Sequence, residues 1–377
     1  MKRIFVFLFF FILTASVHAN NPSYSGLFAA LDSIDEEHKE HGFAGRASFS
    51  RLHELIRKKL STFVLSQMEA ALVKRITNDW RRYTYLHDFV ARKFTKLNDC
   101  EQKFLVASLL YEAGIDTIYG YSASSCHILA SSNIKLYQLA YIYFQQNRYY
   151  VLAPNGISEQ IPDIALYNFG DEGRMLNFEF TVAAASVGNM IDEKEAYAEL
   201  NSQDRFVFSP QKMAFFKTHP QMDYIHYIHA PMSEKLVRNL ENSLLPALST
   251  MDDWHVAQAL MDYIQYNIAE SKDVIDGSHE KVQFMEETLF YKKGDCEDRV
   301  ILYAKLLNLF LKRPMLLVKY ERHLALAIAL NDYDQWQIRL DGKKYTIADP
   351  SIKNGRVGDL MSSLVGETYV VRKINFP

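Results

Sequence analysis

Cysteine is scarce in this sequence, with three residues among 377. Exported proteins that depend on disulfides use cysteine far more densely, so a disulfide-dense scaffold is excluded. Because three is an odd number, at least one thiol stays free or pairs outside the chain. A bridge between Cys100 and Cys126 is compatible with the sequence, and it would leave Cys296 unpaired.

An excess of positive charge is also missing. The chain has 42 Lys and Arg residues against 45 Asp and Glu residues, a net charge of −3 at pH 7. Binding to nucleic acid needs basic residues that displace counterions from phosphate, so we expect no nucleic-acid partner. Glycine-rich phosphate loops and dinucleotide fingerprints are absent, and a nucleotide cofactor is not expected. The pairs His38/His41 and His226/His229 lack the flanking residues of a zinc motif.

No apolar run reaches the roughly 18 residues that suggest a membrane-spanning helix. Lys2 and Arg3 precede a shorter apolar run, Ile4 to Leu13, and small residues follow up to Ala19. This order is typical of a secretory signal peptide. We therefore expect residues 1–19 to be removed, leaving a periplasmic or secreted protein without an integral membrane segment.

Two stretches of the chain, 196 residues apart, carry the same residue types at the same intervals. The spacing is 27 residues from Cys to His and 27 from His to Pro in both. We interpret the match as an internal duplication. The copies differ at the residue before the proline, which is Ala153 in the first and Asp349 in the second. The matched residues are Asp99, Cys100, His127 and Pro154 in the first copy and Asp295, Cys296, His323 and Pro350 in the second.

The pattern of apolar residues predicts an α+β fold. From Asp32 to about Phe94 they recur at helical intervals, and a helix-forming run follows each Cys. Segments with the residue pattern of β-strands come next. In the second copy, Asp341-Gly342 is a strong two-residue hairpin signal between two of these strands. Each copy should therefore pack its Cys-bearing helix on an antiparallel sheet. We expect a signal peptide at 1–19, an N-terminal domain at 20–160, a small β-rich connecting module at 161–235 and a C-terminal domain at 236–377.

The chemistry of the second copy centres on Cys296. Gly294 and the acidic residues after it predict a helix that begins at this Cys. Unsatisfied N–H groups at a helix N-terminus favour a thiolate and can hold an oxyanion. A downstream His323 as base and Asp349 as the group that orients it would complete a nucleophilic triad. Only the second copy carries all three.

Acidic residues surround the Cys. Asp295, Glu297 and Asp298 oppose a thiolate by charge repulsion, so the pair of Cys296 and His323 must be the active unit. The same carboxylates can cap the helix, which is our preferred interpretation, or can hold Ca²⁺, which takes several oxygen ligands.

These residues, taken together, resemble the transglutaminase-like superfamily, particularly exported bacterial transglutaminase-like cysteine proteases. The likeness extends upstream through Ala230-Pro231 and Tyr263 to Tyr266 and covers about 150 residues at the C-terminal end. The resemblance implies a papain-like core and acyl transfer through a thioester, with Cys296, His323 and Asp349 as the triad. The segments that carry it are Glu287-Thr288-Leu289, Gly294 to Asp298, Arg299 to Leu307, His323 and Tyr345 to Pro350.

The resemblance implies further roles. Gln265 occupies a place where relatives put a polar side chain toward the oxyanion, although a helical amide without such a role is the alternative. Some relatives bind Ca²⁺ through acidic residues that match Asp295, Glu297 and Asp298, whereas no cofactor is required. The first copy, with Cys100 and His127 but Ala153, should be a degenerate pseudoenzyme domain.

The sequence leaves the reaction open. We expect a cysteine peptidase or amidase that acts on a peptide or protein substrate, including substrates in the cell envelope. A true protein transglutaminase differs only in whether an amine or water resolves the thioester. A non-catalytic, peptide-binding scaffold made of two such modules is the alternative from another class, since fold alone does not determine function.

Overall fold

The computed structural model describes residues 46–72, 76–158, 161, 163–182, 196–199, 205–271, 281–330 and 336–376. The expected signal peptide, His38 and His41 lie outside these residues. The chain divides into two compact units, Met1–Val187 and Gly188–Pro377. Both combine helices with antiparallel sheets, which confirms the α+β class.

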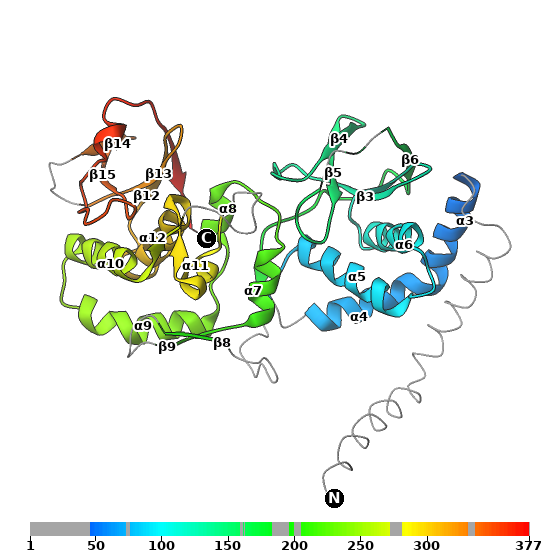
Figure 1. Cartoon of the computed structure of the whole chain (residues 1–377), viewed down its shortest axis with the longest axis horizontal. Helices are drawn as coiled ribbons and strands as arrows, with labels where there is room; N and C mark the ends of the chain where they lie inside the picture. Colours follow the sequence, from blue (N-terminus) through cyan, green and yellow to red (C-terminus); the bar gives the residue numbers. More distant parts are fainter. Residues whose placement is uncertain are drawn as a thin grey trace, which may run out of the picture. The chain divides into compact units, whose positions relative to one another are not determined.

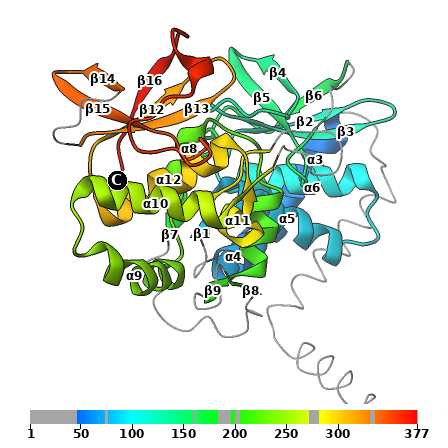
Figure 2. The same ribbon diagram turned by 60° about the vertical axis from the view of Figure 1, so that its left-hand side comes forward.

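In the first unit, helices precede the sheet, as the periodicity up to Phe94 predicts. The helix α6 packs against the strands β2 and β3 (Figure 2). Two strands outside the main sheet, β1 (Ile76–Thr77) and β7 (Thr181–Val182), pair with each other. The helices are α3 (Arg46–Ile56), α4 (Thr62–Leu72), α5 (Asp79–Lys93) and α6 (Asp99–Glu112), with the π-helical turn η1 (Arg57–Ser61) between α3 and α4.

The main sheet of the first unit is antiparallel and has the order β4-β5-β3-β2-β6. It places β3 in the centre, where Leu129 and Ala130 are fully buried. The strands are β2 (Thr117–Tyr121), β3 (Cys126–Ser131), β4 (Tyr141–Phe144), β5 (Asn147–Leu152) and β6 (Ala165–Asn168).

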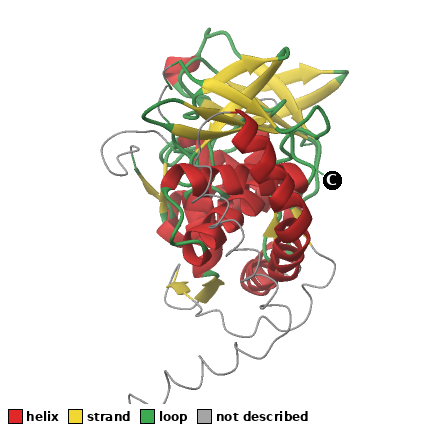
Figure 3. Ribbon diagram, turned by 90° about the vertical axis from the view of Figure 1, so that its right-hand side faces the viewer, coloured by secondary structure: helices red, strands yellow, loops and turns green. Residues whose placement is uncertain are grey.

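The second unit repeats this strand order as β14-β15-β13-β12-β16. Figure 1 shows β12, β13 and β15 on one side of α10 and α12, and α12 contacts β13 directly. Figure 3 distinguishes the helices from the strands by colour. The main strands are β12 (Met315–Lys319), β13 (Leu324–Ile328), β14 (Gln337–Leu340), β15 (Lys343–Ala348) and β16 (Val370–Ile374).

The helices of the second unit include two that the sequence did not indicate. Pro210–Lys217 forms α7 and Tyr224–His229 forms α8. The other elements are α9 (Glu234–Leu248), α10 (Asp253–Asn267), α11 (Met285–Tyr291), α12 (Cys296–Phe310), the 3₁₀ turn η2 (Ser362–Leu364) and the short strands β8 (Ala196–Glu199), β9 (Arg205–Phe208), β10 (Ala269–Glu270) and β11 (Lys293–Gly294).

The expected β-rich module at 161–235 is not a separate unit in the described residues. Its first strand, β6, belongs to the sheet of the first unit, and its last part is helical. Tyr224–His229, in the last part of this expected module, is a helix, because Asp223 caps the segment by accepting the N–H of Ile225 at 3.2 Å.

The Asp341-Gly342 hairpin is confirmed. Both residues have positive φ, 49° for Asp341 and 74° for Gly342, as a tight turn that matches the strand twist requires. The corresponding turn of the first unit is built from Gln145 and Gln146, at 46° and 69°. Residues other than Gly, Asn and Asp rarely adopt this conformation, so Gln145 and Gln146 are no hairpin signal in the sequence.

A buried helix lies at the centre of the second unit. On α12, the residues from Val300 to Leu307 are all buried, and so is every residue of β13. The opposite face of the sheet packs a second cluster that includes Val318, Ile347 and Leu364. In the described part of the chain, no helix combines the length and the apolar character that crossing a membrane requires.

Candidate functional site

Cys296 is the first residue of α12, as the sequence predicts. The N-cap residue Asp295 accepts the N–H of Asp298 at 3.2 Å, and Asp298 accepts that of Asp295 at 3.4 Å. This reciprocal capping fixes where the helix begins. Gly294 is required at this turn, since a Cβ there would lie 2.7 Å from the Cβ of Asp298.

His323 and Asp349 meet at one end of the sheet. Nε2 of His323 lies 2.7 Å from Oδ2 of Asp349, whose side chain is 1 % exposed. The other oxygen of Asp349 accepts the N–H of Ser351 at 2.9 Å. The antiparallel register of β13 and β15 produces this contact, because it pairs Leu326 with Ala348 and so brings both strand ends together.

The thiol of Cys296 reaches the same end of β13. The backbone N–H of Leu324, the residue after His323, is directed so that it lowers the pKa of the Cys296 thiol. Three elements therefore converge: the N-terminus of α12 with Cys296, the start of β13 with His323, and the end of β15 with Asp349. Because Asp349 contacts Nε2 of the ring, Nδ1 is the nitrogen available to the thiol.

Other groups stabilise the protonated thiol. Burial raises the pKa of Cys296 well above its usual range, and the hydrogen bond from Sγ to Oε2 of Glu297, 2.7 Å long, adds to the effect. The charges of Glu297 and Asp295 act in the same direction. Glu297 is itself held in place, because its other oxygen accepts the hydroxyl of Tyr224 at 3.3 Å.

A buried cation, Arg299, lies one helical turn after Cys296, and sequence reasoning did not assign it a role. It is 7 % exposed, and Nη2 donates to the carbonyl of Ile268 at 2.8 Å. Burial lowers its pKa, whereas the charges of Glu270, Asp349, Asp295 and Cys296 raise it. A charged residue in an otherwise apolar helical run was the signal that could have identified it.

Gln265 does not reach the thiol by any described contact. Its side-chain amide donates to the carbonyl of Gly355 at 3.3 Å. The structure therefore supports the alternative of a helical amide with a packing role.

The three acidic residues around Cys296 point to different partners. Asp295 and Asp298 cap the helix, Asp298 also accepts the N–H of Gln283 at 2.6 Å, and Glu297 holds the thiol. No group of three or more metal-ligating side chains occurs among the residues that the structure describes. The carboxylates thus do not form a Ca²⁺ cage in this arrangement, and calcium binding stays a prediction.

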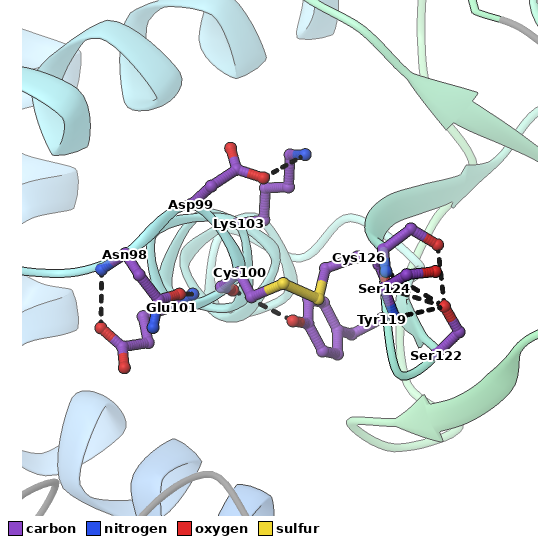
Figure 4. The surroundings of a disulfide bond; sticks show 10 residues. Asn98, Asp99, Cys100, Glu101, Lys103, Tyr119, Ser122, Ser124 and Cys126 are labelled. Carbon is purple, nitrogen blue, oxygen red and sulfur yellow. Dashed lines mark hydrogen bonds and ion pairs between the residues drawn. A yellow bond between two sulfur atoms is a disulfide. The ribbon is translucent and has the colours of Figure 1, made fainter.

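The equal Cys spacing of the two copies does not correspond to equal positions in their helices. In the first unit Asn98, not Asp99, is the N-cap, because Asn98 and Glu101 form the reciprocal capping pair. Asp99 is therefore the first helical residue and occupies the place that Cys296 has in α12. Cys100 comes one residue later, and Figure 4 shows its side chain directed away from those of Asp99 and Lys103.

The strands show a similar displacement for the histidine. The hairpin of the first unit closes with the N–H of Ser122 on the carbonyl of Ser125, at 2.8 Å. In the second unit the equivalent bond runs from Tyr320 to His323, at 2.9 Å. Ser125 thus occupies the position of His323, and His127 lies two residues further along the strand.

The predicted degenerate site at Cys100 and His127 is therefore corrected. The positions of the triad are taken by Asp99, Ser125 and Ala153 in the first unit, where Ala153 and Asp349 each follow the matching strand. Cys100 forms a disulfide with Cys126, which the sequence had left open (Figure 4). Cys296 is the free cysteine.

Comparison with known proteins adds no identification, since no protein-family model, no curated protein and no solved structure matches the chain.

Proposed function

We propose that the second unit is a cysteine peptidase or amidase of transglutaminase-like type, which cleaves an amide bond through a thioester on Cys296. The observation that carries the proposal is the 2.7 Å contact between His323 and Asp349 at the start of β13, where the N–H of Leu324 lowers the pKa of the Cys296 thiol. A carboxylate that accepts one ring N–H fixes the tautomer in which the other nitrogen can take a proton.

In the proposed reaction, Nδ1 of His323 takes the thiol proton as the sulfur attacks the carbonyl carbon of the substrate. The capping pair uses the N–H groups of Asp298 and Asp295, and those of Cys296 and Glu297 at the start of α12 are available to the oxyanion. The C–N bond then breaks, and the proton on Nδ1 goes to the departing amine. Asp349 stabilises the imidazolium throughout.

Water completes the cycle. It attacks the thioester carbonyl and gives a proton to His323, the C–S bond breaks, and the proton returns to sulfur. With an amine in place of water the same steps make a new amide, which is the transglutaminase variant. We favour hydrolysis on the resemblance alone. The proposed substrate is a peptide or protein of the cell envelope, and the protein would be exported to reach it.

Both main sheets have the same strand order around a preceding helix, which supports two transglutaminase-like units derived by duplication. The first unit has Asp99, Ser125 and Ala153 at the positions of the triad, so we assign it no catalysis. This loss favours a second candidate function, in which both units bind extended peptide without turnover.

Incubation with a peptide library distinguishes the candidates. The exported chain should produce cleavage products that disappear in Cys296→Ala and His323→Ala, while Ser125→Ala should leave them unchanged. Identical product profiles for the wild type and Cys296→Ala would refute the proposed chemistry. If the protein instead bound peptides from the library without cleaving them, the result would support the binding function.

A further inference from the structure

We propose that the first unit binds the free C-terminal carboxylate of a peptide that ends in an apolar residue, in a cavity between α5, α6, β3 and β5. The cavity has a volume of about 270 Å³. That is at the small end of ligand pockets and suits the end of a peptide rather than a large ligand. This binding site is distinct from the proposed active site and does not depend on it.

Two histidines that line the cavity each have one ring nitrogen without a hydrogen-bond partner in the described part of the chain. Nε2 of His127 and Nδ1 of His87 are buried, and neither has a hydrogen-bond partner within the described residues. Oδ1 of Asp88 lies 3.7 Å from Nδ1 of His87, beyond hydrogen-bond distance. Buried polar atoms are normally satisfied, so two unsatisfied ones in histidines that line the same cavity indicate a ligand that completes them.

A cation lines the same cavity. Lys103 on α6 faces it, and its Nζ lies 2.7 Å from Oδ2 of Asp99, whose side chain is 76 % exposed. Its charge adds to burial in lowering the pKa of His127. Asp99 acts in the opposite direction, but an exposed carboxylate is screened by water. Lys103 and the two imidazoles together favour an anionic guest.

The second unit shows what is missing from this cavity. Asp349 follows β15 and accepts a hydrogen bond from a histidine, whereas Ala153 follows β5 at the same position and lines the cavity. By the register that pairs Ile128 with Leu152, Ala153 lies opposite His127. A carboxylate from outside the chain would therefore take the place that the Asp349 side chain fills in the other unit.

Apart from Ser158, whose hydroxyl oxygen accepts the N–H of Ala140, the rest of the lining is largely apolar, and this selects the residue that carries the carboxylate. An aliphatic side chain would contact these walls while its carboxylate faces the nitrogens. The apolar lining consists of Tyr83, Ile128, Val151, Leu152, Pro154 and Ile161.

The test uses the exported full chain and three acids, each with its matching amide: acetate, N-acetyl-leucine and N-acetyl-glycyl-leucine. NMR titration should show saturable binding of the two leucine acids, with their amides about tenfold weaker or worse, because a charge-assisted hydrogen bond is lost. Equal binding of acid and amide would overturn the proposal. Binding of acetate with exclusion of N-acetyl-glycyl-leucine would mean a small free acid and would overturn the peptide part.

Two variants place the binding in this cavity. Ala153→Asp supplies a carboxylate opposite His127, so it should abolish binding and raise the pKa of His127 in NMR titration. His127→Asn should weaken acid binding about tenfold or more. The control is His255→Asn, which changes an exposed histidine on α10 and should leave acid binding unchanged. Unchanged acid binding in a folded Ala153→Asp protein would contradict the proposed site.

Discussion

The thiol of Cys296 is held by its own neighbour, since Sγ donates to Oε2 of Glu297 over 2.7 Å. Burial and this carboxylate raise the pKa of the thiol well above its usual range, so the resting nucleophile is protonated. In the proposed reaction, attack therefore requires transfer of the thiol proton to His323 as the substrate enters. This relationship sets the first two predictions.

Glu297→Gln should make Cys296 more reactive. Replacing the carboxylate by an amide removes its charge and the acceptor that favours the thiol, so the pKa of Cys296 falls. We expect alkylation by iodoacetamide at pH 7 to accelerate about tenfold. The matched change Glu241→Gln on α9 should have no effect. A rate equal to that of the wild type in Glu297→Gln would show that this carboxylate does not control the thiol.

The alkylation rate of the wild type should depend on pH in a way that reports the raised pKa. The thiol stays protonated through the range where an ordinary Cys, with a pKa of about 8.5, begins to ionise. The rate should therefore still be rising at pH 9 to 10, measured by mass spectrometry of the modified protein. A rate that reaches its plateau near pH 7 would contradict the raised pKa.

Asp349→Asn should reduce turnover by about 10³- to 10⁴-fold, because the ring of His323 loses the acceptor that fixes its tautomer. Peptide cleavage by the full chain measures this, and circular dichroism checks folding because Asp349 is buried. Asp262→Asn on α10 is the control. Retained turnover in a folded Asp349→Asn protein would remove Asp349 from the triad.

Cys100→Ala should lower the stability of the first unit and leave peptide cleavage nearly unchanged. The disulfide spans 26 residues, and opening a loop of that length costs about 3–4 kcal/mol of unfolding free energy in the chain-entropy model. Denaturant unfolding measures the loss, and Cys126→Ala should match it. A large drop in turnover of the folded variant would contradict the non-catalytic assignment of this unit.

Leu326→Ala, in the centre of β13, should destabilise the second unit by about 2–5 kcal/mol, because it leaves a cavity at a fully buried position. Val370→Ala on the edge strand β16, where the side chain is 72 % exposed, should change stability by less than about 0.5 kcal/mol. Denaturant unfolding of both variants provides the comparison. A similar loss for the two would mean that β13 does not form the core.

The local sequence specified much of the second unit. The turn at Asp341-Gly342, the start of α12 at Cys296 and the apolar run of β13 follow from signals within a few residues, which is why they could be predicted. The helix α8 could not, because its Tyr and Ile residues are typical of strands and its helix signal is the single N-cap residue Asp223. Propensity is a weak guide in so short a helix.

The match between the copies shows where sequence spacing misleads. Equal intervals suggested that Cys100 and His127 are structurally equivalent to Cys296 and His323. The capping pair of Asn98 and Glu101 places Cys100 elsewhere in its helix. The hairpin bond at Ser122 places His127 elsewhere on its strand. Spacing counts residues along the chain, whereas a side chain's position depends on where the helix begins and which residues pair across the sheet.

The sequence by itself determined the α+β class, the order of helix and strands and the candidate triad residues, because these depend on local patterns of apolar, turn and capping residues. Only the tertiary structure decided that His323 contacts Asp349 and that Glu297 accepts a hydrogen bond from the thiol. It also decided that His87 and His127 line one cavity. Such contacts join residues far apart in the chain, or fix one rotamer among several, and are set by packing and strand register.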